Sequence, residues 1–184
     1  DNPYSFILNN EYSSLLAVDG AKETSLELNS LSKSHNMAGW RIGMVAGNSD
    51  YIKTVLKVKS NMDSGMFLAM QMAAVEALNN QESWYDSVNS VYTGRRKIVE
   101  GIMDLLKCRY DKSQVGLFLW GRIPDDISSC EIYVEDILLK SLVFITPGFI
   151  FGKKGERYIR ISLCATEEKL IEAKNRIAGL LFAR

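Results

Sequence analysis

One long amphipathic pattern limits most strongly how this chain can fold. Apolar residues recur at helical spacing from residue 84 to about residue 107. Gly94 and Gly101 interrupt this pattern only weakly. These apolar residues are Trp84, Val88, Val91, Ile98, Ile102 and Leu105. A helix of about 25 residues is long for a small domain and often bridges two lobes. We therefore expect two domains, residues 1–80 and residues 81–184, with a boundary near residues 79–83.

Shorter patterns on both sides of this helix alternate between strand and helix. Period-two alternation and short apolar runs predict strands at residues 25–32, 42–46, 117–120, 142–146 and 158–163. Helical spacing predicts helices at residues 51–58, 66–78, 130–139 and 167–182. We expect strand 42–46 to be buried, helix 66–78 to be buried on more than one side, and Asp50 to cap helix 51–58. The order of elements predicts an α/β fold whose later part is a separate α+β lobe.

Charge balance and the scarcity of metal-binding residues exclude several classes of protein. The 22 Lys and Arg residues match the 22 Asp and Glu residues, so the chain has no basic excess for a nucleic-acid backbone. The three cysteines are scattered and odd in number, so a disulfide framework is not indicated. His35 is the only histidine, which excludes a two-histidine metal site. No apolar run approaches the roughly 20 residues that span a bilayer. We expect a cytoplasmic protein with no metal and no membrane partner.

The segment from Asn29 to Gly43 carries the clearest chemistry. Lys33 is expected at the end of a strand among small hydroxyl residues, and Arg41 follows eight positions later. A lysine forms a Schiff base readily when burial or nearby positive charge destabilises its ammonium form, and an arginine suits bidentate phosphate binding. The spacing alone also fits a solvated loop lysine and a surface arginine. His35, close to the lysine, is placed to line the pocket, but we favour the interpretation that it is a polar loop residue.

The same segment, S-L-S-K-S-H-N-M-A-G-W-R-I-G, resembles the S-x-S-K-x-x-x-x-x-G-x-R-x-G pattern of the class I and II aminotransferases. These are fold type I enzymes that use pyridoxal 5′-phosphate. The resemblance implies that Lys33 carries the cofactor as a Schiff base and transfers a proton between the substrate Cα and the cofactor C4′. It also implies that Arg41 and Ser30, together with Ser32, bind the cofactor phosphate.

Two further segments are similar to motifs of that family. Asp1-Asn-Pro-Tyr4 is similar to D-x-x-Y, which implies that Asp1 pairs with the pyridine nitrogen and that Tyr4 bonds the 3′ oxygen of the ring. Gly155-Glu-Arg-Tyr-Ile-Arg-Ile-Ser is similar to G-x-x-Y-x-R-x-S, which implies that Arg160 binds the substrate α-carboxylate. Arg157 is the competing arginine in that segment, three residues earlier.

The resemblance covers nearly the whole chain but only the second half of the family pattern. It implies that residues 1–80 are the C-terminal part of the large cofactor-binding α/β domain and that residues 81–184 are the small α+β domain. We expect a fragment that is inactive alone, and a homodimer in the full-length protein that acts on amino acids and 2-oxo acids. Leu56 and Lys57 stand where aspartate-specific members carry an arginine, so specificity for dicarboxylates is not indicated.

Two other functions fit the same motifs. A lyase or synthase on the same scaffold would use the same cofactor-holding residues. A non-enzymatic, aminotransferase-like effector domain of a regulator would keep the fold without the reaction. The sequence identifies neither the amino donor nor the acceptor.

Overall fold

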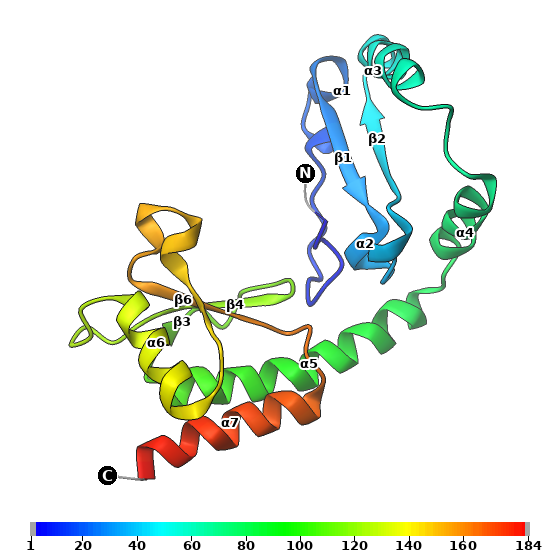
Figure 1. Cartoon of the computed structure of the whole chain (residues 1–184). Helices are drawn as coiled ribbons and strands as arrows, with labels where there is room; N and C mark the ends of the chain where they lie inside the picture. Colours follow the sequence, from blue (N-terminus) through cyan, green and yellow to red (C-terminus); the bar gives the residue numbers. More distant parts are fainter. Residues whose placement is uncertain (1–2, 183–184) are drawn as a thin grey trace. The chain divides into compact units, whose positions relative to one another are not determined.

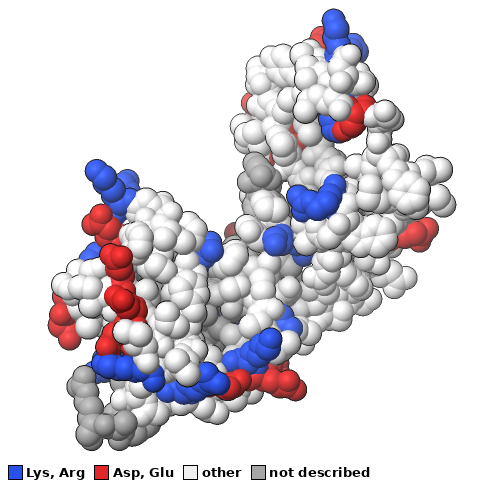
Figure 2. Space-filling model, in the orientation of Figure 1, with Lys and Arg blue, Asp and Glu red and all other residues white. Residues whose placement is uncertain are grey.

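The computed structural model of the chain describes residues 3–182 and forms two compact units, Asp1–Ser87 and Val88–Arg184. On the face that Figure 2 shows, both acidic and basic side chains appear over a largely uncharged surface. Among the described residues, no helix combines the length and the apolar character needed to cross a membrane.

The first unit is built around a two-stranded antiparallel sheet (Figure 1). Strands β1 and β2 pair in a register that runs from Leu26 opposite Gly47 to Ser30 opposite Gly43. The elements in chain order are η1 (Leu15–Ala17), α1 (Ala21–Thr24), β1 (Leu26–Ser30), α2 (Leu31–Ser34), η2 (Ala38–Trp40), β2 (Gly43–Gly47), α3 (Ser49–Met62) and α4 (Leu68–Leu78).

Two burial expectations for this unit are mostly wrong. Of residues 42–46 only Ile42 is buried, every residue of β2 is exposed, and α4 buries only Ala74. Ala74 joins Leu31, Met37 and Ile42 in a small core cluster. An apolar pattern indicates that a segment can be buried, but burial requires another element to cover it. Among the described residues, β2 pairs only with β1.

Helix α3 starts and ends outside the predicted range, and its cap is a different residue. Asn48, not Asp50, is the N-cap, because its Oδ1 accepts hydrogen bonds from the backbone N–H groups of Asp50 and Tyr51. Asp50 instead lies in the first turn, where its carboxylate accepts a hydrogen bond from Lys53 at 2.9 Å. The helix extends beyond the expected residues 51–58 at both ends, because the polar residues of its first and last turns carry no apolar periodicity.

The second unit contains the rest of the long helix and a four-stranded antiparallel sheet of order β3-β4-β6-β5. The long helix expected from the sequence is α5 (Glu82–Leu105), whose first six residues belong to the first unit. The remaining elements are β3 (Arg109–Tyr110), β4 (Phe118–Arg122), α6 (Cys130–Ser141), β5 (Thr146–Pro147), η3 (Gly148–Phe151), η4 (Lys153–Gly155), β6 (Tyr158–Ser162) and α7 (Glu167–Phe182).

The two faces of this sheet differ in burial. Strands β4 and β6 alternate strictly between half-buried and buried residues, as period-two side chains must when one face carries the core. The buried residues of this unit include Leu119, Ile159 and Ile161 of the strands, Val99, Ile102 and Met103 of α5, and Leu170 and Ile177 of α7. The opposite face presents Phe118, Trp120, Tyr158 and Arg160.

The strand predicted at residues 142–146 is mostly absent. Leu142 ends α6 in the left-handed conformation with φ at 58°, and its N–H donates to the carbonyl of Leu138. Phe144 is exposed, and only Thr146 and Pro147 pair with β6. The apolar run therefore serves mainly as the connection after α6.

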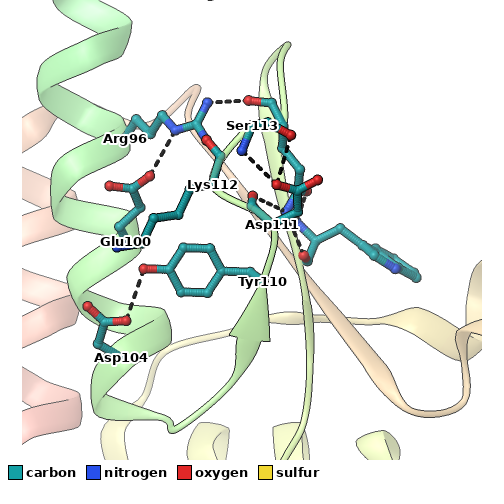
Figure 3. A network of polar contacts seen from close by, with 9 residues as sticks. Arg96, Glu100, Asp104, Tyr110, Asp111, Lys112 and Ser113 are labelled. Carbon is teal, nitrogen blue, oxygen red and sulfur yellow. Dashed lines mark hydrogen bonds and ion pairs between the residues drawn. The ribbon is translucent and has the colours of Figure 1, made fainter.

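A polar network fixes the loop between β3 and β4 to helix α5 (Figure 3). The Arg96 guanidinium donates to the carbonyls of Lys112 and Gln114 and pairs with Glu100 at 3.0 Å. Tyr110 donates to Asp104 at 2.9 Å, and burial together with that carboxylate raises the pKa of Tyr110 to about 12. The network holds one end of the sheet against the helix.

Gly148→Ala should destabilise the second unit. A Cβ at residue 148 would lie 2.6 Å from the carbonyl oxygen of Tyr158 and 2.9 Å from the Trp120 ring. Because backbone atoms cannot move aside, we expect a loss of about 1–3 kcal/mol in the free energy of unfolding. Urea unfolding followed by circular dichroism measures it. Gly179→Ala in α7, where a Cβ meets nothing within 4 Å, is the control and should stabilise by about 0.5 kcal/mol. Equal effects of the two substitutions would contradict the packing described.

Candidate functional site

Lys33 lies on a one-turn helix and not at the end of a strand. Ser30 is the last residue of β1 and also the N-cap of α2, and its Oγ accepts a hydrogen bond from the Ser32 N–H at 3.2 Å. The two hydroxyls, Ser30 Oγ and Ser32 Oγ, lie 2.9 Å apart. Lys33 itself is half-buried, and its neighbour Ser34 is buried. The strand-to-helix change therefore gathers two hydroxyls and one amine within four residues.

Arg41 lies across the sheet from the start of α2. The pairing of Ser30 with Gly43 continues into a hydrogen bond from the Leu31 N–H to the Ile42 carbonyl, at 3.3 Å. Arg41 has a left-handed backbone, with φ at 53° and ψ at 44°. Its exposed guanidinium donates to the Ala38 carbonyl at 3.0 Å. Arg41 therefore lies one residue before the position that bonds the first residue of the lysine helix.

The N-terminal residues of the motif are only partly described. Asp1 lies outside the described residues. Tyr4 is half-buried in a turn, in which its carbonyl accepts the Ile7 N–H at 3.0 Å. Two residues later, the Phe6 ring stacks on the ring of Tyr85 with centroids 5.5 Å apart. The segment that follows Tyr4 is therefore anchored to the start of α5.

His35 is buried, which corrects the expectation of a polar loop residue. The residue is 7% exposed, and each ring nitrogen has a partner at 2.8 Å, Ser34 Oγ for Nδ1 and Tyr85 Oη for Nε2. The imidazole also stacks on Trp84 with centroids 5.6 Å apart. Burial lowers the pKa of His35. The hydrogen bond between His35 and Tyr85 joins residues fifty positions apart. The only sequence feature that relates to it is the adjacent aromatic pair, Trp84 and Tyr85, near the start of α5.

Arg160 lies in an aromatic setting that sequence reasoning missed. Its guanidinium carbon is 4.2 Å from the centroid of the Phe118 ring and 4.2 Å from that of Phe151. On the same face of the sheet, Trp120 stacks on Tyr158 at 5.3 Å. The alternation of Phe118 with the buried Leu119 in β4 could have indicated that Phe118 lies on the half-buried face of the sheet. No pattern in the sequence indicates that Phe151, which belongs to η3, contacts Arg160.

Arg157 is engaged elsewhere. Its guanidinium donates to the backbone carbonyls of Ile127 and of Pro124, the latter at 2.7 Å. It thereby fixes the connection between β4 and α6. Of the two arginines in the motif, Arg160 is the one that lies on the aromatic face, and it belongs to the second unit whereas Lys33 belongs to the first.

Comparison with known proteins agrees with the resemblance seen in the motifs. A family model described as aminotransferase class I and II matches residues 5–177. An LL-diaminopimelate aminotransferase of Aquifex aeolicus is 40% identical over 182 residues, which cover 98% of this chain and 47% of the relative. The chain thus spans about half the length of the curated relatives it matches.

Solved structures give the same picture. An aromatic aminotransferase from Pyrococcus horikoshii superposes with a TM-score of 0.87 at 31% identity, covering 98% of this chain and 49% of that one. A probable N-succinyldiaminopimelate aminotransferase from Thermus thermophilus gives a TM-score of 0.82 at 31% identity, with 96% and 48% covered.

A double-mutant cycle should detect the contact between Arg160 and Phe118. We expect the pair Arg160→Met and Phe118→Leu to show a coupling of about 0.5–2 kcal/mol in urea unfolding, since a guanidinium over a ring contributes about that much. The control pairs Phe118→Leu with Arg176→Met, because Arg176 bonds Glu172 within α7. Coupling as large in the control as in the test pair would refute a specific contact.

Proposed function

Because the chain belongs to the class I and II aminotransferase family, we propose that it supplies the lysine-bearing half of a pyridoxal-phosphate-dependent aminotransferase. Such an enzyme moves an amino group from an amino acid to a 2-oxo acid. The observation that carries the proposal is the Lys33 helix. Its cap, Ser30, pairs with β2, and Ser32 lies on the helix next to Lys33. The first residue of the helix, Leu31, bonds the Ile42 carbonyl, directly after Arg41.

The chemistry of these side chains fits a phosphorylated aldehyde. The amine of Lys33 can bond an aldehyde carbon, and two hydroxyls 2.9 Å apart can donate to neighbouring phosphate oxygens. Arg41 adds a planar guanidinium, the side chain that best binds phosphate in a bidentate manner. We assign the phosphate to Ser30, Ser32 and Arg41.

Each residue then has a distinct task. When bound, pyridoxal phosphate supplies the electron sink that stabilises negative charge at the substrate Cα. Lys33 would hold the cofactor through its side-chain amine, and the same amine, when free, would remove a proton from the substrate Cα and return it. Asp1 is proposed to keep the pyridine nitrogen protonated, and Tyr4 to bond the 3′ oxygen.

Arg160 is proposed to bind the α-carboxylate of the substrate. Its guanidinium carbon lies 4.2 Å from the centres of two aromatic rings. The N–H groups lie in the plane of the conjugated guanidinium, where a planar carboxylate can accept two of them. Fixing the carboxylate orients the Cα–H bond for proton transfer. Arg157 is unsuited to this task because its guanidinium bonds backbone carbonyls.

The finer assignments follow the relatives. We propose residues 1–80 as part of a large cofactor-binding domain, residues 81–184 as the small domain, a homodimer for the full-length protein, and a cytoplasmic location. The relatives named LL-diaminopimelate aminotransferase make LL-diaminopimelate the first amino donor to try.

Reduction with borohydride after addition of pyridoxal phosphate should label Lys33. The experiment uses this chain and the longer gene product that contains it, with peptide mass mapping as the readout. We expect the mass of a reduced pyridoxyl group on Lys33, and its loss in Lys33→Ala.

The control variant is Lys53→Ala, which removes an exposed amine on α3 that pairs with Asp50 and should leave the label in place. Label on Lys33 only in the longer product would mean that the pocket needs both halves. Absence of label on Lys33 in both proteins would refute the proposed function and favour the effector-domain alternative.

A further inference from the structure

The helix that carries Lys33 is too short to hold its own orientation. Helix α2 has four residues, Leu31–Ser34, and a single helical turn is unstable in isolation. Its position must therefore come from contacts outside the helix. Leu31 packs into the small core cluster, and the opposite end is held by Ser34 and His35.

The hydrogen bonds at that end form a chain of four residues within the first unit. Tyr85 Oη lies 2.8 Å from His35 Nε2, His35 Nδ1 lies 2.8 Å from Ser34 Oγ, and Ser34 Oγ lies 3.3 Å from the Ser30 carbonyl oxygen. The chain thus runs from the first turns of α5 to the residue that caps the lysine helix.

Proton counting gives this chain a direction. A serine hydroxyl has one proton, and the Ser30 carbonyl can only accept, so Ser34 donates to Ser30 and must accept from His35 Nδ1–H. Nε2 of the neutral ring is then an acceptor, and the Tyr85 hydroxyl donates a hydrogen bond to it. In this arrangement both ring nitrogens of His35 and the Ser34 hydroxyl have a hydrogen-bond partner, as is usual for buried polar groups.

We propose that His35 is a positioning residue that, as the neutral ring protonated at Nδ1, ties the Lys33 helix to the start of α5 through Tyr85 and Ser34. The importance of that position for the cofactor rests on the proposed function, but the tautomer and the hydrogen-bond chain do not.

The surroundings of the ring favour the neutral form. The titratable groups near it are Tyr85 and, beyond it, Tyr12, whose charge would act on Tyr85. Burial raises the pKa of Tyr85, so the phenol stays protonated and can donate. The stacked Trp84 brings no charge. Protonation of His35 would remove the acceptor that Tyr85 uses, because Nε2–H would then donate to Tyr85 Oη, whereas Nδ1–H would still donate to Ser34.

Nitrogen-15 NMR of the full chain tests the tautomer directly. Because His35 is the only histidine, the spectrum contains one imidazole. We expect a proton-bearing Nδ1 and a hydrogen-bonded acceptor Nε2 at neutral pH. A ring protonated at Nε2, or a rapid mixture of both tautomers, would overturn the proposal.

Tyr85→Phe tests the positioning role, because it removes the hydroxyl and keeps the ring, which stacks on Phe6 and meets the Trp84 ring edge-on. In the longer gene product, we expect about 2- to 10-fold weaker binding of pyridoxal phosphate to Lys33, the loss of one net hydrogen bond. His35→Phe, which keeps an aromatic ring for Trp84, should weaken binding at least as much. Tyr51→Phe on the exposed face of α3 is the control and should change nothing.

The outcomes separate this proposal from the proposed function. An unchanged affinity in Tyr85→Phe and His35→Phe, with Lys33 labelled normally, would overturn the positioning role alone. If Lys33 takes no label in any protein, the function fails, and the tautomer measured by NMR still decides whether the hydrogen-bond chain exists.

Discussion

The close pairing of Ser30 with Gly43 is the constraint on which the candidate site depends. A Cβ at residue 43 would lie 2.6 Å from the Asn29 carbonyl oxygen, so β2 can approach β1 in this register only with glycine there. Ser30 ends the strand in an extended conformation and caps α2 with the same side chain. One residue therefore sets both the end of the sheet and the direction in which the Lys33 helix starts.

Local patterns predicted the elements well where the cause of the pattern was local. The 3.6-residue period of α5 and the alternation of β6 follow from the geometry of a single element, and the structure has both. The full length of α3 was missed because Asn48 and the polar first turn carry no periodic signal. Exposure of β2 was missed because burial depends on what covers a strand and not on its own residues.

The candidate site shows the same division. The lysine segment is continuous in sequence, so its motif could be read directly. The contacts that hold its neighbours are between distant residues, such as His35 with Tyr85 and Arg160 with Phe118, and no spacing rule connects such pairs. The two arginines of the last motif are alike in the sequence, and only the carbonyls around Arg157 distinguish them.

The backbone at Arg41 has an evolutionary consequence. A residue such as Arg41 with a left-handed backbone pays about 1 kcal/mol for the crowding of its Cβ. Glycine avoids that cost because it has no Cβ, and asparagine offsets part of it with a local hydrogen bond. Random drift at this position should therefore favour those two residues wherever the guanidinium has no task. If orthologues nevertheless keep arginine at this position, selection has favoured the guanidinium over the more stable backbone. An alignment of natural sequences would be enough to show it.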